Sequence, residues 1–127
     1  MNISLYSKMK IDLVYLTTLA RDNRDYRRVV ETSKYAQTVV MNLVENEDIP
    51  SEIHSDNIQV IYVVEGLARI MTPHDRQYLS EGQMYVIPMN TQHYVANASP
   101  DNLKLISLYL PPEHPFNRID IREPKRE

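Results

Sequence analysis

The chain of 127 residues contains no cysteine, which excludes disulfide bonds, zinc-thiolate sites and cysteine nucleophiles. It also lacks a long hydrophobic stretch. The longest uninterrupted apolar run, Val60 to Val64, is far shorter than a membrane-spanning helix or the core of a signal peptide. The absence of cysteine also fits a reducing compartment. We therefore expect a soluble, cytoplasmic protein with no membrane partner.

Charge of one sign is not concentrated anywhere along the chain. The sequence has 14 Lys and Arg residues against 17 Asp and Glu residues, which gives a formal net charge of −3. The basic residues are scattered, so the chain offers no positive patch of the kind that binds nucleic acid. We expect no nucleic-acid partner.

Glycine is scarce as well, with Gly66 and Gly82 as the only two in the chain. No glycine-rich loop that could bind a phosphate group is therefore present. The length is that of one domain, which is enough to bury a hydrophobic core without disulfides or a structural metal.

What the sequence does contain is a series of short segments rich in Val, Ile and Tyr, in which apolar and polar residues alternate. A period of two predicts β-strands. Many short strands with no amphipathic helix among them predict an all-β barrel or sandwich. The predicted strands are residues 37–44, 58–64, 67–71, 77–79, 83–87, 92–96 and 103–110, and residues 45–50 are predicted to form a turn.

We divide the chain into an N-terminal segment (residues 1–34), a β-barrel domain (35–117) and a polar C-terminal tail (118–127). The apolar run at residues 11–16 predicts either an edge strand or a short helix, because its periodicity fits both. The predicted strand 58–64 is apolar on both faces, so we expect the barrel interior to cover one face. The N-terminal segment or a second subunit would cover the other, and a homodimer is therefore expected.

Two histidines, a carboxylate and an amide form the candidate site. Glu52 and His54 are two residues apart, so on a strand they point to the same face. Gln59 begins the next predicted strand, and His93 lies in a later one. Two imidazoles and one carboxylate can hold a metal ion and leave positions open, with Gln59 as a weak oxygen ligand. The alternatives are two structural histidines, a surface glutamate, and an amide that only donates hydrogen bonds to a ligand.

The sequence around His93 resembles one of the two metal-binding motifs of the cupins, which are small double-stranded β-barrels. That motif reads glycine, five residues, proline, one residue, glycine, two residues, histidine, three residues, asparagine. The chain matches every position except the second glycine, which is an asparagine. The corresponding positions are Gly82, Pro88, Asn90, His93 and Asn97, of which only Asn90 departs from the motif.

The sequence around Glu52, His54 and Gln59 resembles the other cupin motif. That motif reads glycine, five residues, His-x-His, three or four residues, glutamate, six residues, glycine. All spacings are kept here, while three residue types change. The corresponding positions are Asn46, Glu52, His54, Gln59 and Gly66. Glu52 replaces the first histidine, and Gln59 replaces the glutamate. Asparagine tolerates the left-handed backbone conformation better than most residues, so we expect the turns at 46 and 90 to survive.

Residues 35–117 are also similar to a branch of small single-domain cupins labelled mannose-6-phosphate isomerase-like. The resemblance implies a double-stranded β-helix, or jelly roll, of antiparallel strands. It also implies a divalent transition metal (Fe, Mn, Zn or Ni) bound by Glu52, His54, Gln59 and His93.

The function that this resemblance implies is action on a small molecule, by isomerase chemistry of the sugar-phosphate type or by dioxygenase chemistry. A non-catalytic module that binds a small molecule or sugar is the main alternative, and a purely structural β-barrel is another. The remaining histidines are assigned no part in the site. His74 lies in an expected hairpin turn, and His114 is expected to be structural or on the surface.

Overall fold

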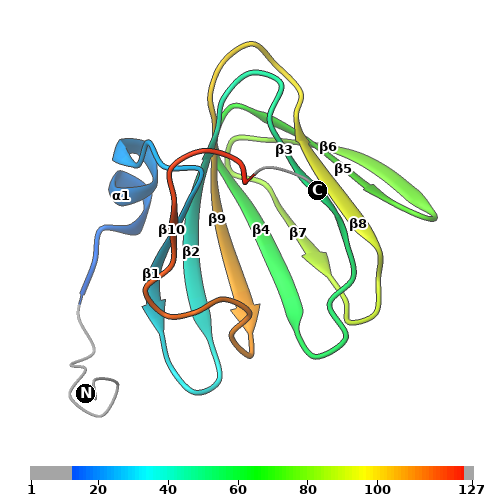
Figure 1. Ribbon diagram of the computed structural model, residues 1–127. Coiled ribbons are helices and arrows are strands. Elements are labelled where there is room, and N and C mark those ends of the chain that lie inside the picture. Colours follow the sequence, from blue (N-terminus) through cyan, green and yellow to red (C-terminus); the bar gives the residue numbers. More distant parts are fainter. Residues whose placement is uncertain (1–12, 125–127) are drawn as a thin grey trace.

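The computed structural model describes residues 13–124, which form two antiparallel sheets that face each other and one short helix (Figure 1). The helix is α1 (Leu16–Asp22). The strands are β1 (Arg27–Thr32), β2 (Gln37–Leu43), β3 (Asp48–Glu52), β4 (Ile58–Glu65), β5 (Leu67–Thr72), β6 (Asp75–Ser80), β7 (Met84–Ile87), β8 (His93–Asn97), β9 (Leu103–Leu110) and β10 (Ile119–Asp120). Within this range, no helix combines the length and the apolar character that crossing a membrane requires.

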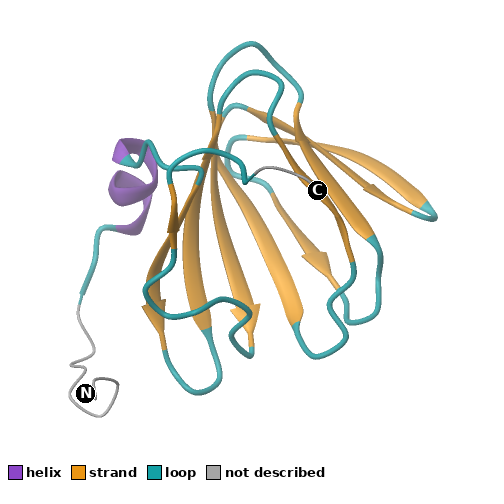
Figure 2. Cartoon of the chain, viewed as in Figure 1, coloured by secondary structure: helices purple, strands orange, loops and turns teal. Residues whose placement is uncertain are grey.

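Strands from distant parts of the chain lie side by side in both sheets. The six-stranded sheet has the order β10-β1-β2-β9-β4-β7, and the four-stranded sheet has the order β3-β8-β5-β6. Strand β9 pairs with β2 on one side and with β4 on the other, both in antiparallel register. The predicted double-stranded β-helix of antiparallel strands is therefore confirmed, and Figure 2 shows how little of the chain is helical.

The hydrophobic core fills the space between the two sheets, and the alternation along β4 shows how. Ile61 and Val63 point inward and are fully buried in the main core cluster. Val64 points outward and packs with Ala20 of α1 in a second, smaller cluster. The N-terminal segment thus covers one end of the outer face of β4, as the apolar pattern of that strand predicts.

Three strands of the structure lie outside the seven predicted strand ranges. Strand β3 begins at Asp48, so the turn predicted for residues 45–50 was wrong in its second half. Pro50 is accommodated there because β3 is the edge strand of its sheet. Strands β1 and β10 come before and after the range 35–117, and they pair with each other. Residues 11 and 12 of the predicted N-terminal strand or helix lie outside the described residues.

Four of the residues that the structure describes adopt a positive φ, and they are the four turn positions of the two motifs. The angles are 72° at Asn46, 60° at Asn90, 97° at Gly66 and 86° at Gly82. The prediction that asparagine keeps the turns of the family pattern is confirmed. The backbone N–H of Asn90 also donates a hydrogen bond of 2.8 Å to the carbonyl oxygen of His54, which joins the second motif to the first.

We predict that the two glycines differ in their tolerance of alanine. A Cβ at Gly82 meets no atom within 4 Å, whereas a Cβ at Gly66 would lie 2.6 Å from the carbonyl oxygen of Asn102. Gly82→Ala should lower the free energy of unfolding by about 1–2 kcal/mol, the cost of the left-handed conformation alone. Gly66→Ala should cost about 1–3 kcal/mol more because of the clash. Urea denaturation measures both, and equal losses would contradict the prediction.

Candidate metal centre

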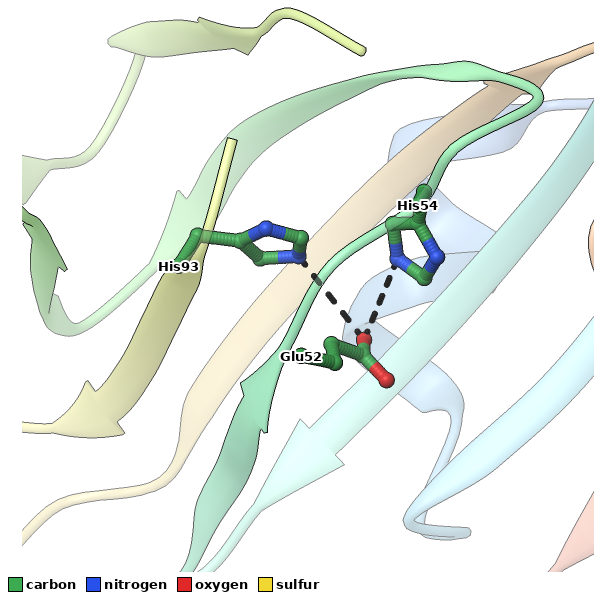
Figure 3. Close-up of side chains that lie close together, drawn as sticks. All are labelled: Glu52, His54 and His93. Atoms are coloured by element: carbon green, nitrogen blue, oxygen red, sulfur yellow. Dashed lines mark ion pairs between the residues drawn. The ribbon is translucent and has the colours of Figure 1, made fainter. Parts of the chain in front are cut away.

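Glu52, His54 and His93 converge at one edge of the four-stranded sheet. Glu52 ends β3 and is the direct cross-strand partner of His93, the first residue of β8. His54 follows in the loop toward β4. One ligand atom from each of the three side chains lies within 4.8 Å of the others. Figure 3 shows both imidazoles directed toward the Glu52 carboxylate.

The way in which Glu52 and His54 meet differs from the prediction. We expected regular alternation along one strand, but β3 ends at Glu52 and its pairing with β8 shifts in register after Ile49. The two side chains therefore approach each other through the bend that follows the strand. The spacing of two residues correctly indicated that the two side chains lie together, but the bend after β3 brings them together and not the alternation of a strand.

Each imidazole turns its Nε2 atom toward the same carboxylate oxygen. Oε1 of Glu52 lies 3.2 Å from Nε2 of His54 and 3.8 Å from Nε2 of His93. Both histidines are buried, and neither Nε2 atom has a hydrogen-bond partner among the described residues. Buried polar atoms without a partner cost free energy. A cation between these three atoms would satisfy all of them.

The hydrogen bond of the other ring nitrogen decides the tautomer of His93. Its Nδ1 lies 2.9 Å from the carbonyl oxygen of Thr91. A carbonyl oxygen only accepts, so Nδ1 carries the hydrogen, and Nε2 of the neutral ring carries a lone pair. That lone pair faces a carboxylate, which is also an acceptor. Metal-binding histidines are commonly oriented in this way.

The pKa shifts of Glu52 and His54 favour an ionised carboxylate beside a protonated imidazole. Burial raises the pKa of Glu52, but its interactions with His54 and His93 together outweigh burial and lower the pKa to about 2. The contact with Glu52 raises the pKa of His54, against a smaller opposing effect of desolvation. Glu113 adds to this increase. In the metal-free chain these interactions therefore favour a proton on the His54 imidazole, beside the Glu52 carboxylate.

Gln59 lies beside this group and is almost completely buried. Its Nε2 donates hydrogen bonds to the hydroxyls of Tyr109, at 3.1 Å, and Ser107, at 3.4 Å. Its Oε1 has no hydrogen-bond partner in residues 13–124, yet Gln59 is near enough to His54 to contribute to its raised pKa. All four residues predicted from the sequence thus come together, and Gln59 adds another unsatisfied acceptor.

Tyr109 and His114 form a second layer behind these residues. The ring of Tyr109 is edge-on to His54 at 5.9 Å and to His114 at 5.0 Å between centroids. Burial, followed by the charge of Glu52, raises the pKa of Tyr109 well above its usual value, so its hydroxyl stays protonated. Burial and the charge of Arg27 lower the pKa of His114 to about 4, so its ring is neutral.

Sequence reasoning missed Glu113. Its Oε1 lies 3.4 Å from Nδ1 of His54 and accepts a hydrogen bond of 2.7 Å from Nδ2 of Asn57. Glu113 is far from His54 along the chain, in a proline-rich stretch after β9 that matches neither motif, so no spacing indicated it. His74, in contrast, is exposed in the turn between β5 and β6, as expected.

Comparison with known proteins agrees with the fold. Residues 39–109 match the cupin domain family. The chain belongs to the cupin family. Members of the family commonly bind a divalent metal, and the matched range contains Glu52, His54 and His93.

This cupin has curated relatives that are themselves uncharacterised. It is 43% identical over 107 residues to protein L612 of Acanthamoeba polyphaga mimivirus, an alignment that covers 81% of this chain and 67% of the relative. It is 29% identical over 113 residues to YrkC of Bacillus subtilis, covering 84% and 61% of the two chains. The cupin described here therefore spans about two thirds of the length of these relatives or slightly less.

Its fold is also similar to that of solved structures. The crystal structure of BH2720 from Bacillus halodurans superposes with a TM-score of 0.86 at 28% sequence identity. The match covers 91% of this chain and 92% of the other. The structural similarity therefore extends beyond residues 39–109 and includes parts of the sheets that lie before or after this range.

We predict that His54 of the metal-free cupin titrates above the ordinary histidine pKa of 6.5, because Glu52 stabilises its protonated form. A raised pKa in the folded state means that this pairing stabilises the fold below pH 6.5 and is lost as the pH rises through the raised value. Glu52→Gln should lower the titration midpoint of His54. NMR of the imidazole resonances measures it, with the exposed Glu81→Gln as control. An unchanged midpoint in Glu52→Gln would contradict the prediction.

Proposed function

We propose that this cupin binds one divalent transition metal through Glu52, His54 and His93, with Gln59 as a weaker fourth ligand, and acts on a small molecule there. One observation carries the proposal: two buried Nε2 atoms without hydrogen-bond partners face one carboxylate oxygen. Two histidines and one carboxylate that leave positions open suit Fe, Mn, Zn or Ni.

A metal in this place supplies Lewis-acid polarisation of a bound oxygen atom or, if it is iron, activation of dioxygen. Glu52 contributes one negative charge, so a divalent ion keeps a formal charge of +1 and favours an anionic or enolate ligand. The amide of Gln59 is held by Ser107 and Tyr109, which keeps its orientation fixed. This chemistry fits isomerisation of a hydroxy-carbonyl compound or oxidation by a dioxygenase.

Binding without catalysis is the second candidate, and the environment of the site supports it. Proton transfer is most efficient when the pKa of the catalytic group lies near the working pH. The pKa of Tyr109 is raised and that of His114 is lowered to about 4, so neither group is tuned for this task. A binding module would be stabilised thermally by its small-molecule ligand and would show no turnover.

We predict that the full-length protein, stripped with chelator and reloaded, retains one transition-metal ion per chain. Glu52→Ala and His93→Ala should lose it, because each removes one of three converging ligands. His74→Ala is the matched control, since His74 is an exposed histidine away from the cluster. Elemental analysis after desalting measures the metal content. Wild-type protein that retains no metal, or Ala variants that retain as much as His74→Ala, would refute the proposal.

The contribution of Gln59 needs a separate variant and a measurement of affinity, by titrating the metal against a competing chelator. Gln59→Leu keeps the site filled but removes the amide oxygen, so the metal should bind more weakly in this variant while the stoichiometry stays the same. Equal affinity would show that Gln59 is not a ligand. Incubating the loaded protein with hydroxy-carbonyl compounds, with and without dioxygen, then separates the two candidates: product formation supports catalysis, and stabilisation alone supports binding.

A further inference from the structure

We infer that Glu113 is a positioning residue that fixes His54 for metal binding, an inference that rests on the proposed function. His54 lies between two carboxylates. Its Nε2 faces Glu52 at 3.2 Å, and its Nδ1 faces Glu113 at 3.4 Å. A metal at Nε2 requires a lone pair on that atom, so Nδ1 must carry the hydrogen. A carboxylate next to Nδ1 favours this tautomer and makes Nε2 a stronger ligand.

The side chain and the backbone of Glu113 are each held by a buried amide. Nδ2 of Asn57 donates a hydrogen bond of 2.7 Å to its carboxylate. Oε1 of Gln37 accepts from the backbone N–H groups of Glu113, at 3.1 Å, and His114, at 2.9 Å, while its Nε2 donates to the carbonyl oxygen of His114 at 2.7 Å. Gln37 and Asn57 are both nearly inaccessible to solvent. The segment after β9 is thus fastened where Glu113 reaches His54.

The two histidines of the centre are oriented by different groups. His93 donates its Nδ1 hydrogen to a neutral backbone carbonyl, that of Thr91. His54 instead faces a carboxylate, which carries a full negative charge. The family pattern has a glutamate where this chain has Gln59. Glu113 therefore supplies, behind His54, a negative charge that Gln59 does not.

Cobalt(II) titration of the metal-stripped, full-length protein tests this inference, because Co²⁺ bound to the centre is followed by its visible absorbance. Glu113→Ala should weaken cobalt binding about 10- to 100-fold, the usual effect of losing such a partner. Glu113→Gln keeps an acceptor but loses the charge, so its affinity should lie between those of Glu113→Ala and the wild type. Glu81→Gln should bind as the wild type does.

Thermal unfolding of the metal-free variants separates positioning from a purely structural role. If Glu113 only fastened the chain segment, Glu113→Ala would lower the melting temperature without graded loss of cobalt affinity. Equal affinity in wild type, Glu113→Ala and Glu113→Gln would overturn the inference and leave the proposed function intact. No cobalt binding by the wild type would instead refute the proposed function itself, and this inference with it.

A second, independent feature is an exposed apolar surface on the outer face of β4, β7 and β9. The exposed fractions are 63% for Met84, 49% for Val86, 36% for Leu108 and 41% for Leu110. Val60 pairs with Val86 on one side and with Leu108 on the other, so these side chains form one continuous surface. Continuous exposed apolar surfaces commonly mark sites of protein interaction.

We propose that this surface is the contact between two copies of the chain. The helix α1 covers only the end of the face near Val64 and Ile106. On β4, β7 and β9, the side chains that point outward between that end and Leu110 are uncharged. The whole chain, in contrast, carries a net charge of −3. An uncharged apolar surface complements itself across a two-fold axis without repulsion. It offers no charge by which a strongly acidic or basic partner would be recognised.

Sedimentation equilibrium of the full-length protein tests the dimer. The wild type should show twice the chain mass of 14.9 kDa, and the double variant Val86→Glu with Leu108→Glu should show the mass of one chain. Ile121→Glu, an exposed apolar residue just after β10 at the opposite edge of the six-stranded sheet, should remain dimeric. Unchanged cobalt binding would show that the double variant is folded. A monomeric wild type, or a double variant that stays dimeric, would overturn the proposal.

Discussion

The Nε2 atoms of His54 and His93 both face one carboxylate oxygen of Glu52, and neither of these buried nitrogens has a hydrogen-bond partner among the described residues. A proton or a metal cation between these atoms would remove the cost of leaving them unpaired. The low pKa of Glu52 and the raised pKa of His54 are the response of the metal-free chain to this constraint.

The fold brings these atoms together by pairing strands and by fixing turns. Glu52 and His93 are opposite each other on β3 and β8, so their proximity follows directly from the register of the sheet. His54 lies beyond the end of β3, where no strand register places it. The turn at Asn90, with its left-handed backbone, holds the His54 carbonyl through a hydrogen bond and so connects the two motifs.

The charges around the centre are arranged in layers. Glu52 faces Nε2 of His54, while Glu113 faces Nδ1 on the other side of the same ring. Gln59 brings an uncharged oxygen where the family pattern has a carboxylate. In the metal centre proposed above, such a distribution would neutralise a bound cation less directly and would leave more positive charge for a ligand at the open positions. This property suits both an enzyme that stabilises an enolate and a module that binds an anionic small molecule.

The sequence by itself determined the features that depend on local geometry. Alternation of apolar residues indicated seven of the strands, and the spacing of the motifs indicated Glu52, His54, Gln59 and His93. The asparagines in place of glycine indicated the left-handed turns, since few residues tolerate positive φ. Only the tertiary structure decided which side chains from unrelated segments become neighbours. Glu113 reaches His54 because Gln37 and Asn57 fasten the segment after β9, and contacts between segments so distant leave no periodic signal in the sequence.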